Sequence, residues 1–174
     1  MNWTDLLKTE TDSAYRAAER LLSHVEEDAL DWKPSDSNNW MTTGQLLKHI
    51  TEACGSTCRG FVTGDWGMPD GVEINDMPED AMLPPAESLP TVASIAAARE
   101  ALAADKRLAI QMIDQAADRL DDPTPAPWAP EYPLPLGQQL LGMINHLNNH
   151  KAQLFYYLKL QGKPVNTMHF YGMA

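Results

Sequence analysis

The sequence predicts an all-α protein, a four-helix bundle with a long crossover between the second and third helices. Aromatic residues make up only 7% of the 174-residue chain, and no stretch alternates apolar and polar residues as a half-buried strand would. Four segments instead repeat apolar residues at about 3.6 positions, the period of an α-helix. The connections after the second and third segments are long and rich in proline. The length fits a single domain over residues 1–174.

The first helix is expected over Trp3–Asp28, where apolar residues fall on one helical face. Turn-forming residues at 31–39 end it. The second helix is expected to begin near Thr42, because Thr42 and Gln45 have the spacing of a capping box, which satisfies two free backbone N–H groups at a helix start. Its apolar pattern continues to Gly64, so one unbroken helix is predicted there.

Residues 65–90 are rich in Gly, Pro and acidic residues and are too numerous for a tight turn between helices. A segment of this length can cross the whole bundle, so the helices on either side of it can run in the same direction. The third helix is expected over Thr91–Leu120. Residues 121–135 carry six prolines, which predicts a stiff extended link. The fourth helix is expected over Leu136–Gln161.

The charge and the cysteines limit the partners and the compartment. Thirteen Lys and Arg against 24 Asp and Glu give a net charge of −11, which disfavours nucleic acid and anionic membrane surfaces as partners. No apolar run is long enough to span a bilayer, and the N-terminus lacks the features of a signal peptide. Cys54 and Cys58 lie four residues apart on one predicted helix, where a relaxed disulfide is disfavoured. We therefore expect two free thiols and a cytoplasmic protein.

Three histidines are predicted to face the interior of the bundle near its edge. His146 and His150 lie four residues apart, which places both on one face of the fourth helix. His49 borders the apolar face of the second helix. An unpaired buried imidazole is costly, and one shared metal ion would satisfy all three rings. Hydrogen-bonded or exposed histidines without a metal are the alternative interpretation.

Three protein ligands would leave a coordination position open for water or substrate, as in catalytic sites. Two familiar metal motifs are absent. Leu147 occupies the position where the H-E-x-x-H motif needs glutamate, and the paired Glu-x-x-His motif of di-iron bundles does not occur. His24, near the end of the first helix, is expected to have a structural role because the helix dipole favours a cation there.

These motifs resemble those of the DinB/YfiT-like superfamily of metal-dependent four-helix-bundle proteins. The similar parts are Trp40 followed by the threonine-capped helix with LLKHI at 46–50, and H-x3-H-K-A-Q-L at 146–154. Members of that family commonly have H-x3-H-R-G-Q-L, so Lys151 and Ala152 replace Arg and Gly. The resemblance extends over nearly the whole chain, although only the two helix motifs are specific to the family.

The resemblance implies a homodimer that binds a divalent transition metal through His49, His146 and His150. Zinc and nickel are the first choices, with iron, cobalt and manganese as alternatives. Characterised relatives include S-transferases and isomerases that use low-molecular-weight thiols, and many members have no assigned reaction. S-transfer with such a thiol is therefore the leading expectation. A metal-assisted hydrolase and a non-catalytic metal- or ligand-binding bundle are the alternatives, and no carboxylate general base is identified.

Four further residues are candidates for contact with a substrate or for orienting the site. Gln153 is spaced to orient a ligand or a bound water, or else is an exposed polar residue. Tyr157 follows on the same face and would either donate a proton or pack at the edge of the core. Arg99 and Lys106 fall within the apolar stripe of the third helix. Each would either extend to solvent or meet a substrate carboxylate or an acid of a partner subunit.

Overall fold

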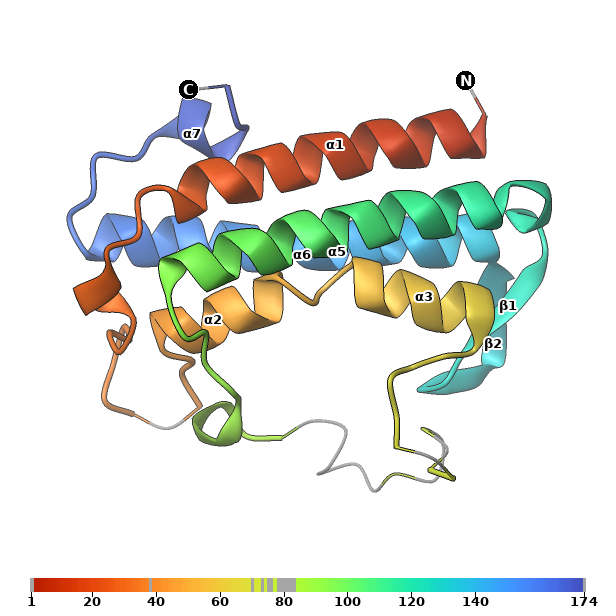
Figure 1. Ribbon diagram of the computed structural model, residues 1–174, viewed down its shortest axis with the longest axis horizontal. Helices are drawn as coiled ribbons and strands as arrows, with labels where there is room; N and C mark the ends of the chain where they lie inside the picture. The colour runs from red at the N-terminus through yellow and green to blue at the C-terminus, as the bar shows by residue number, and fades with distance from the viewer. Residues whose placement is uncertain are drawn as a thin grey trace.

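The computed structural model describes residues 2–37, 39–69, 71, 72, 74, 77 and 84–173, and it is mostly helical (Figure 1). None of the helices in this part of the chain has the length and apolar character needed to cross a membrane. The helices are α1 (Trp3–Leu22), α2 (Thr43–Ile50), α3 (Gly55–Thr63), α5 (Ile95–Gln115), α6 (Leu136–Leu160) and α7 (Thr167–Phe170), with short 3-10 turns at Glu27–Ala29, Ala86–Ser88 and Ala117–Arg119 and strands β1 (Pro123–Ala126) and β2 (Ala129–Pro135). The helical class is thus confirmed, whereas the structure departs from a strict four-helix pattern at two places.

The first departure is a break in the expected second helix, which forms α2 and α3 separated by residues 51–54. The side chain of Asp105 in α5 caps the new helix start. Its two carboxylate oxygens accept hydrogen bonds from the backbone N–H groups of Gly55 and Ser56, each at 3.0 Å. A Cβ atom at Gly55 would lie 2.1 Å from the backbone oxygen of Asp105, so only glycine allows α3 to begin so close to α5.

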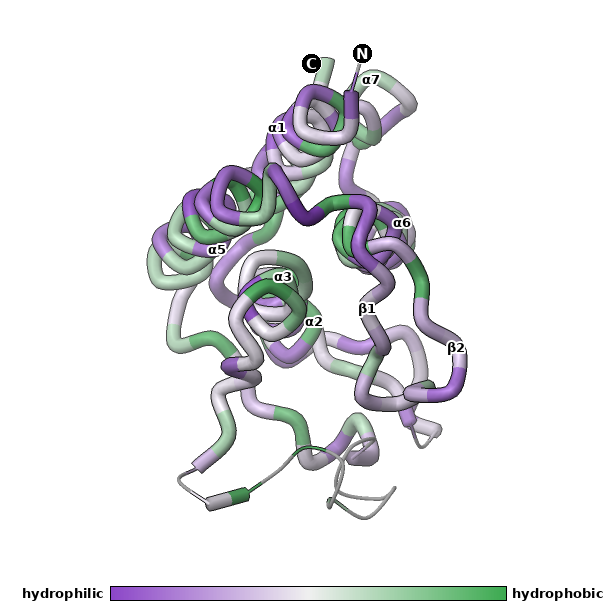
Figure 2. The backbone as a smooth tube through the Cα atoms, turned by 90° about the vertical axis from the view of Figure 1, so that its right-hand side faces the viewer, coloured by the Kyte–Doolittle hydropathy of each residue, from purple (hydrophilic) through white to green (hydrophobic). Residues whose placement is uncertain are grey.

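The helices surround one apolar core (Figure 2). Figure 1 shows that α2, α3 and α5 run in one direction, while α1 and α6 run in the opposite direction. The shared direction of α3 and α5 agrees with the expectation for the crossover, although part of the segment 65–90 lies outside the described residues. Fully buried core side chains include Leu7, Leu21, Leu46, Ile50, Ile113, Leu140 and Leu158.

The second departure is the proline-rich link at 121–135, which folds back on itself instead of remaining a single extended segment. Strands β1 and β2 pair antiparallel, with Pro123 opposite Pro135. Each strand of a two-stranded sheet has a free edge, where prolines are tolerated. Trp128, in the turn, packs edge-on against Phe61 of α3 with ring centroids 5.7 Å apart. The hairpin is therefore anchored on the helices by an aromatic contact that proline content alone does not predict.

Candidate metal centre

His49 lies in the last turn of α2, and the start of this helix has the capping box predicted from the sequence. The Thr42 hydroxyl accepts a hydrogen bond from the backbone N–H of Gln45 at 3.2 Å. The Gln45 side-chain oxygen accepts one from the N–H of Thr42 at 2.8 Å. Neighbouring apolar side chains face the core and are fully buried, which leaves His49 half-buried on the flank of the helix.

His146 and His150 lie one turn apart on α6, and both are half-buried. The buried face of this helix is apolar and packs into the core. Both imidazoles therefore stand between the core and solvent, close to the positions that helical periodicity predicts. The buried apolar side chains of this face include Leu140, Ile144, Leu147, Leu154 and Leu158.

The three imidazoles converge on a common point. The Nε2 atom of His150 lies 2.9 Å from Nε2 of His146 and 3.0 Å from Nε2 of His49. The Nε2 atoms of His49 and His146 are 3.2 Å apart. The structure thus brings together the three histidines that the sequence selected, although metal binding by them stays a prediction.

Three nitrogens this close cannot all satisfy one another through hydrogen bonds. The Nε2 atom of a neutral imidazole either carries a proton or presents a lone pair. With two states and three atoms, at least two Nε2 atoms must be in the same state. Two protons or two lone pairs then face each other within 3.2 Å. A cation bound to three lone pairs would remove this conflict.

The nitrogen spacing fits the ligand set of a transition metal. Imidazole nitrogens bind zinc at about 2.0–2.1 Å, so two of them on one ion are about 2.9–3.4 Å apart for angles of about 90–110°. The observed separations of 2.9–3.2 Å lie in this range. Within the described part of the chain, no cysteine, aspartate or glutamate joins the cluster. The three imidazoles alone would leave coordination positions for water or a substrate.

The surroundings favour the neutral, metal-binding form of each imidazole. Burial, followed by the charges of His150 and His146, lowers the pKa of His49 to about 4. Burial also lowers the pKa of His146 and of His150. The hydrogen bond of His146 to the backbone of Ala53 and that of His150 to the side chain of Gln153 act in the opposite direction but do not outweigh burial. The cluster therefore remains unprotonated at neutral pH.

A chain of hydrogen bonds orients His150. Its Nδ1 atom lies 3.1 Å from Oε1 of Gln153. The amide nitrogen of Gln153 donates to the Tyr157 hydroxyl at 3.3 Å, and this hydroxyl donates to the backbone carbonyl of Met41 at 3.0 Å. Because a carbonyl can only accept, Tyr157 must donate to it, and Gln153 then presents its oxygen to His150. His150 therefore carries its proton on Nδ1 and its lone pair on Nε2, as a metal ligand requires.

An uncharged cavity of about 500 Å³ adjoins this hydrogen-bond chain. Gln153 and Tyr157 line it together with Trp40, whose ring centroid lies 6.5 Å from that of Tyr157. No lining side chain is charged, so the cavity suits an apolar, uncharged ligand. The remaining lining residues are Pro34, Asn149, Ala152, Tyr156 and Leu160.

Two of the other candidates lie elsewhere. Arg99 and Lys106 line a groove between α1 and α5, and its lining includes none of the three histidines. Lys106 forms an ion pair with Asp12 at 2.7 Å. His24 lies just beyond α1, and its ring packs edge-on against that of His169 with centroids 4.8 Å apart. Burial and the charge of His169 lower the pKa of His24, so the ring does not favour the cationic form expected at a helix end.

Sequence reasoning missed Asp105, a buried carboxylate that accepts a 2.6 Å hydrogen bond from the Tyr15 hydroxyl. Burial raises the pKa of Asp105 and of Tyr15, and the charges of Cys54 and Asp105 further raise that of Tyr15. Asp105 shares the buried face of α5 with Ala98, Leu102 and Ala109. The predicted apolar stripe, which held Arg99 and Lys106, lies to one side of this face, and neither of those two residues is buried. Cys54 and Cys58 are buried free thiols, as predicted.

Comparison with known proteins adds a family match to this geometry. The model of a family described as the DinB superfamily matches residues 10–154, a range that includes all three histidines and Gln153. No curated protein and no solved structure matches the chain.

Proposed function

The chain belongs to the DinB superfamily, and on that premise we propose that it is a metal-dependent enzyme in which His49, His146 and His150 bind one divalent transition-metal ion. The convergence of three Nε2 atoms within 3.2 Å carries this proposal. The hydrogen-bond chain that holds the lone pair of His150 toward the same point supports it. Zinc and nickel suit an all-imidazole ligand set, and iron, cobalt and manganese are alternatives.

For the reaction, we propose transfer of a low-molecular-weight thiol to a small electrophile. When bound, the metal would lower the pKa of a thiol or water in its open position to near neutrality. The thiol would lose its proton to solvent, and its sulfur would form a bond to the electrophilic carbon while the bond from that carbon to a leaving group breaks. The leaving group would depart with the electron pair of that bond and take up a proton from solvent. The uncharged cavity beside Gln153 and Tyr157 supports an apolar electrophile, since a charged substrate would find no counter-charge there.

The residues of this chain would orient the metal ligands and provide apolar contacts to the substrate. Gln153 and Tyr157 would hold His150 in the ligand tautomer, and the Trp40 and Tyr156 rings would cover the apolar part of the substrate. Holding the reacting groups together in a fixed orientation is a large source of rate enhancement.

The metal content of the purified protein tests the site. Protein prepared without chelator should carry close to one transition-metal ion per chain by mass spectrometry of its metals. His150→Ala should lose most of this metal because two imidazoles bind far more weakly than three. His24→Ala, which changes a histidine outside the cluster, should keep it. Wild-type protein that purifies without metal and binds none when titrated would contradict the proposal.

A thiol panel tests the reaction. Conjugation of apolar electrophiles with several low-molecular-weight thiols should be measured with metal-loaded and metal-free protein. The proposal expects turnover that requires both a thiol and the metal. Metal-dependent turnover of ester or amide substrates without thiol would indicate hydrolysis instead, and inactivity in both assays would indicate a non-catalytic metal-binding protein.

Two further proposals concern the protein in the cell. The buried free thiols of Cys54 and Cys58 support a reducing compartment, and we propose the cytoplasm. Family membership supports a homodimer of single-domain subunits. Light scattering on the purified protein would give twice the chain mass of 19.3 kDa if this is correct.

A further inference from the structure

A second cavity lies between α1 and α5, and its lining comes from these two helices alone. Its volume of about 690 Å³ is within the range of small-molecule sites. Figure 2 shows α1 and α5 next to each other, with α6 across the molecule from α5. None of the residues that form the histidine cluster or its hydrogen-bond chain lines this groove.

The groove is positive on an otherwise acidic protein. Four of its lining side chains are cationic and two are acidic, so its formal charge is +2, whereas the chain as a whole has a charge of −11. Three of the six arginines of the chain, Arg16, Arg99 and Arg107, line it. A local excess of positive charge raises the local concentration of anions.

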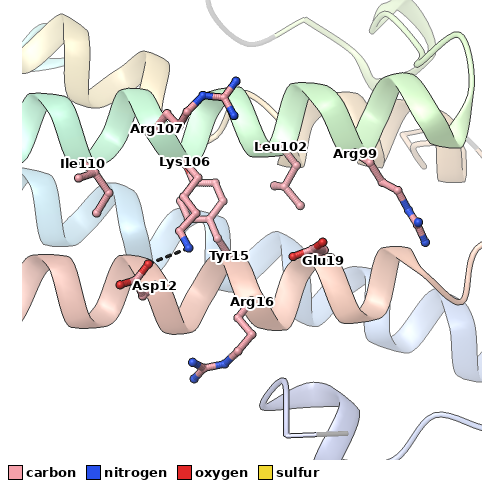
Figure 3. A pocket seen from close by; sticks show the side chains of 10 residues that line it. Asp12, Tyr15, Arg16, Glu19, Arg99, Leu102, Lys106, Arg107 and Ile110 are labelled. Carbon is pink, nitrogen blue, oxygen red and sulfur yellow. Dashed lines mark ion pairs between the residues drawn. The ribbon is translucent and has the colours of Figure 1, made fainter.

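Arg99 is the cation that faces the groove without a counter-ion among the described residues. Lys106 is neutralised by Asp12 at 2.7 Å. Figure 3 shows that Arg99 extends from α5 toward α1, whereas Arg16 and Arg107 extend outward from the two helices. The planar guanidinium group offers paired N–H donors that match a carboxylate or a phosphate.

The floor beside Arg99 is apolar. Leu102 and Tyr15 are both buried, and the Tyr15 hydroxyl is directed away to Asp105, to which it donates a hydrogen bond at 2.6 Å. Tyr15 therefore presents its ring and not its polar atom to the groove. The acidic side chains Asp12 and Glu19 also line the groove, and they would repel a ligand that carries several negative charges.

We propose that this groove is a second ligand site, which binds a small amphipathic anion. The carboxylate or phosphate of the ligand pairs with Arg99, and its apolar body lies over Leu102 and Tyr15. The proposal is independent of the metal centre.

Calorimetric titration of the full chain with octanoate and with octyl phosphate tests the site and distinguishes the two headgroups. Either anion should bind, whereas 1-octanol, which lacks the charge, and acetate, which lacks the apolar body, should bind at least tenfold more weakly. Arg99→Gln should weaken binding at least tenfold, the effect of losing a charge-assisted pair. The matched control is Arg20→Gln, which changes an arginine of α1 that does not line the groove.

Three results would overturn the proposal. One is the absence of binding of both anions to the wild type at millimolar concentration. Another is equal binding of octanol and octanoate, which would mean a purely apolar site. The third is octanoate binding that Arg99→Gln leaves unchanged, which would place the ligand elsewhere, for example in the cavity beside Trp40. Arg99 is exposed, so the melting temperature of the variant should equal that of the wild type.

Discussion

At the scale of single residues, the proton on His150 is placed by groups outside the histidine cluster. The chain from His150 through Gln153 and Tyr157 ends on the carbonyl of Met41, which precedes α2. Because this carbonyl cannot reverse its role, the direction of every hydrogen bond in the chain follows from it. The same contacts join α6 to the segment that leads into the helix of His49.

Removing the amide of Gln153 should therefore weaken metal binding while all three ligands remain. We expect Gln153→Leu to lower zinc affinity about 10–100-fold, the usual effect of removing the group that orients a ligating histidine. Competition with a chromophoric chelator measures this affinity. Asn149→Leu is the matched control, since Asn149 lines the same cavity one turn away on α6. Equal affinities of the two variants would show that the hydrogen-bond chain does not tune the site.

The lowered pKa values of the histidines predict how the stability of the metal-free protein depends on pH. Folding lowers the pKa of His49 from its ordinary value of 6.5 to about 4, so the unfolded chain binds more protons between these values. The free energy of unfolding should therefore fall as the pH decreases from about 6.5 toward 4. Asp105, whose pKa is raised, acts in the opposite direction. Urea unfolding of His49→Leu beside the wild type isolates the histidine contribution, and the variant should show the weaker loss toward acid.

Helical periodicity was sufficient to select the three histidines, because it decides which side chains share a face. It could not supply the partner of Tyr157, since Met41 is 116 residues away in the sequence and is contacted through its backbone. Asp105 lies with Ala98, Leu102 and Ala109 on the buried face of α5, whose alanines give only a weak apolar pattern in the sequence. The N–H groups that Asp105 caps belong to another helix.

At the scale of elements, the break between α2 and α3 allows these two helices to make different contacts. Helix α2 presents His49 toward α6, and α3 packs against α5 at Gly55. The apolar pattern runs through the break because residues on both sides of it still face the core. A period of 3.6 therefore predicts one helix. The composition of the proline-rich link likewise predicts extended backbone. It does not predict that the two halves of the link pair with each other as strands.

The cap that Asp105 provides to α3 should be a major contribution to stability. Asp105→Ala leaves the buried Tyr15 hydroxyl and two backbone N–H groups without their acceptor, which should lower the free energy of unfolding by about 2–4 kcal/mol. Asp114→Ala, on the same helix, removes only an exposed ion pair with Lys8 and should cost less than about 1 kcal/mol. Urea unfolding of both variants measures the difference, and similar losses would argue against the capping role.

At the scale of the whole molecule, the proposed metal would join α2 to α6, whereas the anion groove lies between α1 and α5. The two sites are thus formed by different pairs of helices around one core. A ligand at either site should stabilise the fold, because each needs side chains from two helices in their native positions.

Zinc should therefore raise the melting temperature of the metal-free protein. At a free concentration of 100 times Kd, linkage gives about 2.7 kcal/mol, and about 2–4 °C per kcal/mol is typical for a chain of this size. Differential scanning fluorimetry should thus show a rise of about 5–10 °C. The rise should disappear in His150→Ala and persist in Arg99→Gln. A zinc-induced shift that survives in His150→Ala would place the metal outside the cluster.

The long sequence interval between His49 and the α6 pair bears on how a nascent chain acquires its ion. His146 and His150 are neighbours as soon as α6 forms, whereas His49 is separated from them by 97 and 101 positions. Closing a loop of this length costs about 4–5 kcal/mol of chain entropy. A zinc ion that binds during synthesis would therefore be bound weakly by two imidazole rings until the tertiary structure brings the third ring into place. High-affinity zinc binding then requires the complete tertiary structure, so refolding experiments can use zinc affinity as a measure of completed folding.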